Sequence, residues 1–170
     1  MAHIQPLTPD MADAVEALLD RALGPERRER TAYKVRGDAP PIAALGFAAL
    51  ENGELIGSIQ CWPVALILDA GQASPLVMVG PVAVAPERQG DGVGRRLTEM
   101  ALDVAAAQGL DRALCLIGDP EYYSRFFGFT AERTGVWRVP GPVERHRLLA
   151  RGPDVPAGAG VLGPRSTNGA

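Results

Sequence analysis

The chain has 170 residues, 46% hydrophobic and 22% charged, which are the proportions of one ordinary globular domain. Its net charge of -3 argues against a dedicated nucleic-acid-binding protein, which normally carries a basic surplus. No apolar run reaches the roughly 18 residues of a membrane span, and the N-terminal residues lack a secretory signal. We therefore expect a cytoplasmic protein that binds neither membranes nor nucleic acids.

The first part of the chain carries two helix patterns. Residues 8–10, Thr-Pro-Asp, are typical of a helix start, and apolar residues then recur at helical spacing until Gly24. A second helix is expected from Pro25 through the charged stretch that ends at Gly37. Its three arginines, at positions 27, 28 and 30, are interpreted as a solvated helix face, with an anion-binding patch as the alternative.

The middle of the chain changes to strand patterns. Residues 44–68 read as two strands joined by Asn52-Gly53, a dipeptide that favours a tight hairpin turn. The valine-rich run over residues 76–86 predicts a buried central strand. Gly80-Pro81 lies inside this run, and a proline has no N–H to donate, so we expect the sheet to splay there.

A glycine-rich turn, a helix over residues 95–109 and a strand over residues 110–118 come next. Together with the central strand they predict a βαβ unit with parallel strands. The buried stripe of this helix is expected to contain Leu97, Met100, Ala101, Val104 and Gln108.

The last part of the chain begins with a short aromatic helix after Asp119-Pro120. Strands are expected near Phe129–Glu132 and near His146–Ala150, so that one domain covers residues 1–151. Residues 152–170 are rich in Gly, Pro and Ala and are interpreted as a C-terminal tail, with docking of Val161-Leu162 as an alternative.

The two cysteines, Cys61 and Cys115, lie in apolar segments without the spacing or the histidine partners of metal ligands. We therefore expect two buried free thiols and no metal site.

The turn after the central strand has the composition of a phosphate-binding loop. Residues 88–94 read Arg-Gln-Gly-Asp-Gly-Val-Gly, and glycines let backbone N–H groups approach an anion at a helix N-terminus. The dinucleotide fingerprint fails because Arg95 stands where it needs a glycine. The nucleoside-triphosphate loop fails because this turn contains no lysine. What remains is the pattern Gln89-x-x-Gly92-x-Gly94.

This pattern, preceded by Val82-Ala83-Val84-x-Pro86, resembles the pyrophosphate loop of the GNAT superfamily of acyl-CoA N-acyltransferases. The order of predicted elements from Ile4 to Ala150 is similar as well, and the stretches RTAYKVR, CWPV and DPEYYSRFFGF resemble the YhbS-like bacterial branch. The resemblance implies an α/β fold, α+β by some schemes. Its mixed central sheet has about six or seven strands, a splayed strand 4/strand 5 pair and flanking helices.

The resemblance implies acetyl-CoA as co-substrate and names its binding residues. Backbone groups of Val82, Ala83 and Val84 are expected to pair with the pantetheine arm. The pyrophosphate is expected against the N–H groups of Gln89, Gly90, Asp91, Gly92, Val93, Gly94 and Arg95, with added charge from Arg95 or Arg96. Asp91 departs from the family pattern, because a carboxylate repels phosphates. This implies either weaker binding or an outward-pointing side chain.

The resemblance also implies that an amine attacks the thioester directly and that a tyrosine protonates the departing CoA thiolate. Tyr123 is the first candidate for this acid and Tyr122 the second. Tyr123 stands five residues before Gly128, whereas the family spacing is four residues. The residue four positions before Gly128 is Ser124, whose hydroxyl is too weak an acid for this role. Aromatic packing is the alternative role of both tyrosines.

The sequence therefore predicts an N-acetyltransferase acting on a primary amine of a small molecule or peptide, with a homodimer as a further expectation from the family. A catalytically silent acyl-CoA-binding sensor module is the alternative. Trp62 either shapes the acceptor pocket or packs in the core. No general base is identified. The candidate carboxylates are Glu51, Glu54, Asp69 and Glu87, and the alternative is a relay of water molecules to the solvent, which needs no dedicated residue.

Overall fold

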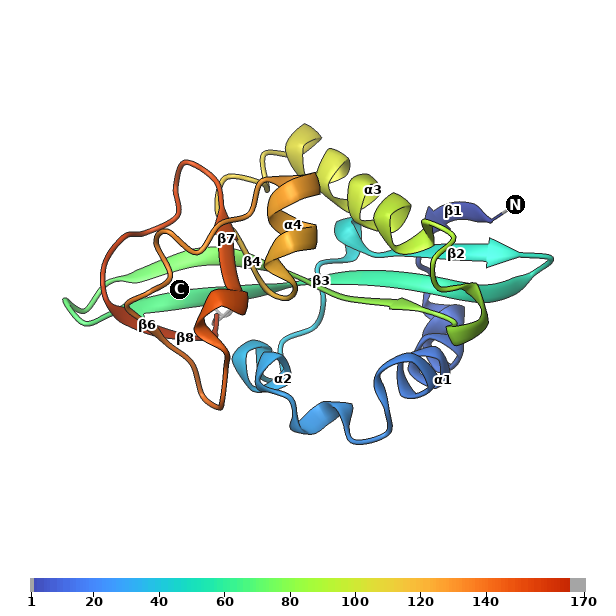
Figure 1. Ribbon diagram of the computed structural model, residues 1–170, viewed down its shortest axis with the longest axis horizontal. Helices are drawn as coiled ribbons and strands as arrows, with labels where there is room; N and C mark the ends of the chain where they lie inside the picture. Colours follow the sequence, from blue (N-terminus) through green and yellow to red (C-terminus); the bar gives the residue numbers. More distant parts are fainter. Residues whose placement is uncertain (1, 166–170) are drawn as a thin grey trace. The chain divides into compact units, whose positions relative to one another are not determined.

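The structure is a computed structural model that describes residues 2–165 (Figure 1). The chain divides into two compact units. Unit 1 consists of Met1–Arg28, Pro41–Cys61 and Gly80–Gln108, and unit 2 of Glu29–Pro40, Trp62–Val79 and Gly109–Ala170. None of the helices in the described residues has both the length and the apolar character that a bilayer crossing requires.

Unit 1 contains an antiparallel sheet. Strand β1 (His3–Pro6) pairs with β2 (Phe47–Glu51), and β2 pairs with the first part of β3 (Glu54–Leu68). Asn52 and Gly53 join β2 to β3 with φ values of 52° and 79°, the positive pair that a tight hairpin turn requires. The predicted hairpin is confirmed. Strand β1 was missed, because its four residues are too few to show a pattern.

Helix α1 (Ala12–Leu23) confirms the first predicted helix and buries Val15, Leu18 and Leu19. The second expected helix is broken at Arg30, whose ψ of 148° is extended, so that α2 comprises only Thr31–Arg36. The interpretation of Arg27 as a solvated residue is wrong, because its side chain is 1% exposed. Two carboxylates one turn apart on α1, Glu16 and Asp20, bind its guanidinium.

Helix α3 (Val93–Ala107) is present as predicted, but its buried face is rotated from the expected stripe. Met100 is 36% exposed and Gln108 is exposed. The cause is close packing on β3, where a Cβ on Gly57 would lie 2.9 Å from Val93 and 3.0 Å from Leu97. The buried residues of α3 are Val93, Leu97, Thr98, Ala101, Leu102 and Ala105.

The sheet of unit 2 continues along β3 and β4 (Ala73–Val84) and adds β5 (Leu114–Ile117), which runs parallel to β4. Strand β7 (Leu148–Arg151) pairs with β5 in the antiparallel sense. The hydrogen-bonded order is β1-β2-β3-β4-β5-β7, which confirms the predicted mixed sheet with its parallel β4/β5 pair. The β4/β5 ladder consists of Val77–Leu114 and Met78–Cys115, so it stops before Gly80, where the sequence predicts a splay.

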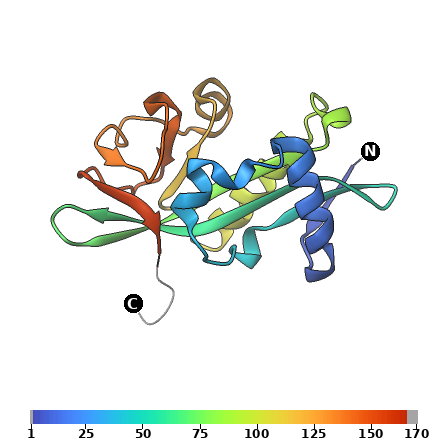
Figure 2. The same ribbon diagram turned by 90° about the horizontal axis from the view of Figure 1, so that it is seen from below.

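The C-terminal part holds two strands that the sequence analysis missed. Strand β6 (Trp137–Arg138) pairs with β8 (Gly160–Pro164), and β8 lies along β3, as its red ribbon shows in Figure 2. Strand β8 falls in the segment interpreted as a tail. Gly160 permits the pairing, because a Cβ there would lie 2.5 Å from the carbonyl oxygen of Ile67. Residues 166–170 of the tail lie outside the described residues.

Two other predicted strands are shorter than expected. The strand expected near Phe129–Glu132 is reduced to one bridge between Thr130 and Ala150. The last predicted strand begins at Leu148, because Arg145–Arg147 form a 3-10 turn.

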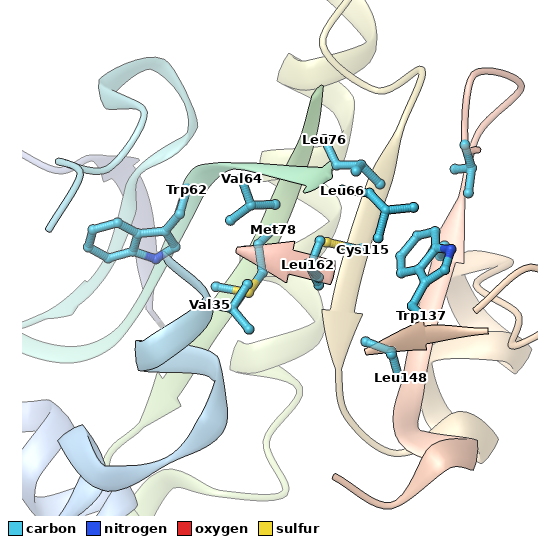
Figure 3. Close-up of a cluster of buried hydrophobic side chains, with 12 residues drawn as sticks. Val35, Trp62, Val64, Leu66, Leu76, Met78, Cys115, Trp137, Leu148 and Leu162 are labelled. Carbon is cyan, nitrogen blue, oxygen red and sulfur yellow. The ribbon is translucent and has the colours of Figure 1, made fainter. Parts of the chain in front are cut away.

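The core of unit 2 gathers side chains from α2 and from six strands (Figure 3). Its members are Val35, Trp62, Val64, Leu66, Leu76, Met78, Cys115, Trp137, Leu148, Ala150, Val155 and Leu162. Cys61 in unit 1 and Cys115 in unit 2 are buried free thiols, as predicted. Burial raises the pKa of each to about 12.

Candidate functional site

The loop between β4 and α3 is built on two glycines. Gly90 and Gly92 have φ values of 91° and 80°, which side chains with a Cβ rarely adopt. A Cβ on either glycine would meet nothing within 4 Å, so the space beside both is open. Gly92 directly precedes α3, whose first N–H groups have no partner inside the helix. This backbone arrangement suits an anion.

Two side chains of the loop are held by the protein itself. Gln89 Nε2 donates to the carbonyl oxygen of Val84 at 3.3 Å. Asp91 Oδ2 accepts from Arg88 Nε at 2.9 Å, and the same guanidinium binds Glu51 at the end of β2. The hydrogen bond from Arg88 lowers the pKa of Glu51. Asp91 and Glu51 are therefore bound to one cation.

The strand residues before the loop pack against α3. Ala83 is buried, and Val82 and Val84 are half-buried. A Cβ on Gly94 would lie 3.5 Å from Val84 and 3.6 Å from Val82, so these side chains line the helix at its first turn. The arrangement fixes the position of Val93 and Gly94 relative to the strand end.

The two arginines at the start of α3 differ in what they bind. Arg95 is half-exposed and donates to Glu99 at 3.1 Å on the helix surface. Arg96 donates to the carbonyl oxygen of Ala2 at 3.1 Å. Arg96 is thus directed to the N-terminal residues.

Tyr122 and Tyr123 lie on α4 (Pro120–Phe127), which Asp119 caps by accepting a hydrogen bond of 3.0 Å from the N–H of Glu121. Their rings meet edge to face with centroids 4.9 Å apart. The Tyr123 ring also fills space over Gly118, where a Cβ would lie 2.6 Å from its Cε2 atom. A side chain at position 118 would therefore displace the ring.

Burial raises the pKa of Tyr123 to about 12, with a further contribution from Tyr122, while the nearby cation Arg147 opposes the shift. The phenol therefore keeps its proton at neutral pH, and burial makes it a weaker acid than an exposed tyrosine. Ser124, at the family spacing, donates to the carbonyl oxygen of Phe129 at 2.6 Å. Its hydroxyl thus links the C-terminal end of α4 to the residue after Gly128 by a hydrogen bond.

Three of the four candidate bases are held in ion pairs. Besides Glu51, Asp69 pairs with Arg138 at 2.5 Å and Glu87 pairs with Arg21 at 2.8 Å. The hydrogen bond from Arg138 lowers the pKa of Asp69, and the pKa of Glu87 is lowered by its own backbone N–H and by Arg21. Lowered pKa values make these carboxylates weak bases.

Trp62 belongs to the core of unit 2 and is 7% exposed. The guanidinium carbon of Arg36 lies 3.7 Å from its ring centroid and 3.8 Å from that of Tyr33. The structure therefore places Trp62 in the core, beneath a stacked arginine.

A cavity of about 560 Å³ opens in unit 2. It is lined by Glu29, Arg30, Thr31, Ala32, Ile117, Pro142, Val143, Glu144 and Arg147. No motif in the sequence points to Arg147, because its neighbours in the cavity come from distant segments. Within residues 2–165, no group of three or more His, Cys, Asp or Glu residues is arranged to hold a metal ion.

Solved structures show what the chain resembles. The GNAT family N-acetyltransferase YhbS from Escherichia coli, in complex with CoA, matches with 25% identity and a TM-score of 0.75 over 96% of this chain and 89% of that one. A GNAT family acetyltransferase from Brucella melitensis, in complex with acetyl-CoA, matches with 26% identity and a TM-score of 0.64 over 93% of each chain.

A third structure, the ribosomal-protein-S18-alanine N-acetyltransferase from Escherichia coli, shares the fold at 21% identity and a TM-score of 0.55, over 88% of this chain and 90% of that one. The comparison with curated proteins finds no match. The model of the Acetyltransferase (GNAT) family matches residues 12–129, which is more than half of the chain. The chain therefore belongs to the GNAT family of acetyltransferases.

Proposed function

We propose that the protein transfers the acetyl group of acetyl-CoA to a primary amine of a small molecule or a peptide. The β4–α3 loop carries this proposal, because its two left-handed glycines leave open space at the start of a helix. The ligands of the Escherichia coli and Brucella melitensis structures, CoA and acetyl-CoA, support the same co-substrate here. The residues proposed to bind it are Val82, Ala83, Val84, Gln89, Gly90, Asp91, Gly92, Val93, Gly94 and Arg95.

The proposed chemistry needs one proton donor. The amine nitrogen attacks the thioester carbonyl carbon, the C–S bond breaks, and the sulfur leaves with the bonding electron pair. Tyr123 gives its proton to this sulfur as negative charge develops there, and Arg147 stabilises the phenolate. The proton that the amine loses restores the phenol through solvent. A donor of this kind contributes roughly 10²- to 10⁴-fold in rate.

Titration of the purified protein with acetyl-CoA tests the co-substrate site. We expect Gly92→Glu to weaken binding by roughly 50-fold or more, because its charge and side chain enter the anion site. Gly71→Glu is the matched control: it has a φ of 109°, open space around its Cβ and a position in the β3–β4 turn, and it should bind like wild type. Wild-type affinity in a folded Gly92→Glu variant would refute the site.

Turnover tests the proton donor. We expect Tyr123→Phe to lower kcat by roughly 10²-fold with the acetyl-CoA affinity unchanged, and Tyr122→Phe to lower it far less. A larger effect of Tyr122→Phe on kcat would make Tyr122 the proton donor in place of Tyr123. Unchanged turnover in both variants would show that neither tyrosine is the proton donor. Binding of acetyl-CoA without transfer to any amine would favour the sensor module.

From the family resemblance we also propose that the protein forms a homodimer and is located in the cytoplasm. Light scattering of the purified protein at several concentrations tests the dimer, and fractionation of the producing cells tests the location.

A further inference from the structure

The walls of the cavity in unit 2 are joined by a hydrogen bond. Thr31, at the start of α2, donates from Oγ1 to the carbonyl oxygen of Pro142 at 2.6 Å. A Cβ on Gly141 would lie 2.5 Å from the same hydroxyl, so the two segments are closely packed. Thr31 itself is 7% exposed. A hydrogen bond and close packing therefore join two of the segments that line the cavity, in agreement with a largely pre-formed small-molecule site.

Arg147 occupies a fixed backbone position in this cavity. Its N–H donates to the carbonyl oxygen of Glu144 at 2.9 Å, and its carbonyl oxygen accepts from the N–H of Gly118 at 2.9 Å. Gly118 follows β5 directly and lies under the Tyr123 ring. The backbone of Arg147 is thus tied to the residue that positions the proposed acid.

The guanidinium of Arg147 has no carboxylate partner among residues 2–165. Its side chain is half-buried, and its charge acts on Tyr123. This differs from Arg21, Arg112 and Arg138, which are more exposed and are all paired with carboxylates. A half-buried cation loses hydration, and a bound anion restores the lost interaction.

The rest of the lining is both apolar and charged. Ala32, Ile117 and Val143 supply an apolar wall. Glu144 is exposed and faces His146 at 3.4 Å, and Glu29 is exposed as well. The acids therefore lie where water solvates them, whereas Arg147 lies deeper.

We propose that this cavity binds the acceptor amine and selects amines that carry a carboxylate and an apolar side chain, with Arg147 binding the carboxylate. The inference rests on the proposed function and names its substrate class: apolar amino acids and compounds with the same groups. A planar guanidinium binds a carboxylate through two parallel hydrogen bonds. Polyamines and other multiply cationic acceptors would bring like charge to Arg147 and are disfavoured.

Matched pairs of acceptors test the inference. L-leucine is compared with L-leucinamide, and L-phenylalanine with L-phenylalaninamide, by the initial rate of CoA release at saturating acetyl-CoA. We expect the acids to be preferred by roughly 10-fold or more in kcat/KM, because a charge-assisted bidentate contact is lost in the amides. The amides have the lower amine pKa, so near neutral pH a larger fraction of their amine is unprotonated, and a preference for the acids runs against this effect.

Variants then assign the preference to Arg147. Arg147→Gln should remove the preference and raise KM for the acids, while Arg147→Lys retains part of it and both variants bind acetyl-CoA like wild type. Arg125→Gln, an exposed arginine on α4, is the matched control and should keep the preference. Because Arg147 also stabilises the Tyr123 phenolate, kcat of Arg147→Gln should fall for acids and amides alike. A fall in kcat that leaves the preference for the acids unchanged would contradict the proposal.

The remaining outcomes separate the inference from the proposed function. Equal or better turnover of the amides, or a preference that persists in Arg147→Gln, overturns the inference. So does binding of acetyl-CoA with transfer to none of the four compounds. Failure of the folded wild-type protein to bind acetyl-CoA overturns the proposed function as well.

Discussion

Arg88 and Asp91 form an ion pair of 2.9 Å inside the loop between β4 and α3. The same guanidinium binds Glu51, so one cation connects the loop to the end of β2. A carboxylate at position 91 would by itself repel a pyrophosphate. With Arg88 bound to it, the charge of Asp91 is compensated inside the protein.

The pairing predicts how acetyl-CoA binding responds to charge changes in the loop. Arg88→Gln leaves Asp91 and Glu51 uncompensated and should weaken binding by roughly 10-fold at low salt and by less at high salt. The double variant Arg88→Gln/Asp91→Asn should recover part of the loss. Titration calorimetry measures both effects, and Arg112→Gln, from an exposed pair in unit 2, is the control. Equal loss in the single and double variants would show that Asp91 is not the repelling group.

Gly118→Ala should act on catalysis through the Tyr123 ring. The added Cβ would lie 2.6 Å from Tyr123 Cε2, so the ring must move. We expect kcat to fall by roughly 10²-fold, as for Tyr123→Phe, with the acetyl-CoA affinity unchanged. Gly135→Ala is the control, because a Cβ there meets nothing within 4 Å. Wild-type kcat in Gly118→Ala would mean that the position of this ring does not matter for turnover.

The pH dependence of turnover follows from the Tyr123 phenol. Burial raises its pKa to about 12, above the ordinary value of 10, so the proton stays on Tyr123 at pH values where an exposed tyrosine ionises. Activity should therefore rise as the acceptor amine loses its proton and show no loss up to about pH 10. A pH profile of kcat measures this. An alkaline loss centred below pH 10 that disappears in Tyr123→Phe would contradict the raised pKa.

Arg27 should contribute more to stability than its neighbour Arg28. Arg27 is 1% exposed and binds Glu16 and Asp20, whereas the side chain of Arg28 is 62% exposed and binds Glu16 alone. We expect Arg27→Gln to lower the free energy of unfolding by about 1 to 3 kcal/mol and Arg28→Gln by less than about 0.5 kcal/mol. Urea denaturation of both variants gives the comparison, and equal losses would be inconsistent with the burial of Arg27.

Strand β8 should stabilise unit 2. Leu162 is 1% exposed and packs in the core cluster, whereas Val161 on the opposite face is 39% exposed. Leu162→Ala should cost about 2 to 4 kcal/mol of unfolding free energy, and Val161→Ala less than about 1 kcal/mol. Thermal and urea unfolding measure the difference. A neutral Leu162→Ala would show that the C-terminal segment is not part of the stable fold.

Features with a local cause were predicted from the sequence. The β2–β3 turn follows from Asn52-Gly53, because few residues tolerate positive φ at two successive positions. The start of α4 follows from Asp119-Pro120, where the Asp119 side chain caps the N–H of Glu121. The glycine loop after β4 was identified in the same way, since its backbone conformation depends on the glycines themselves.

Features that depend on partners in other elements of the fold were decided by the tertiary structure. Arg27 is buried because Glu16 and Asp20 lie on a neighbouring helix turn, and no periodicity in its own segment shows this. Gly160–Pro164 becomes a strand because β3 offers an edge and Gly160 allows close approach. In each case the deciding contact is made with another element of the fold. Local sequence determines the backbone conformation that a segment prefers, whereas side-chain burial and strand pairing depend on the other segments that pack against it.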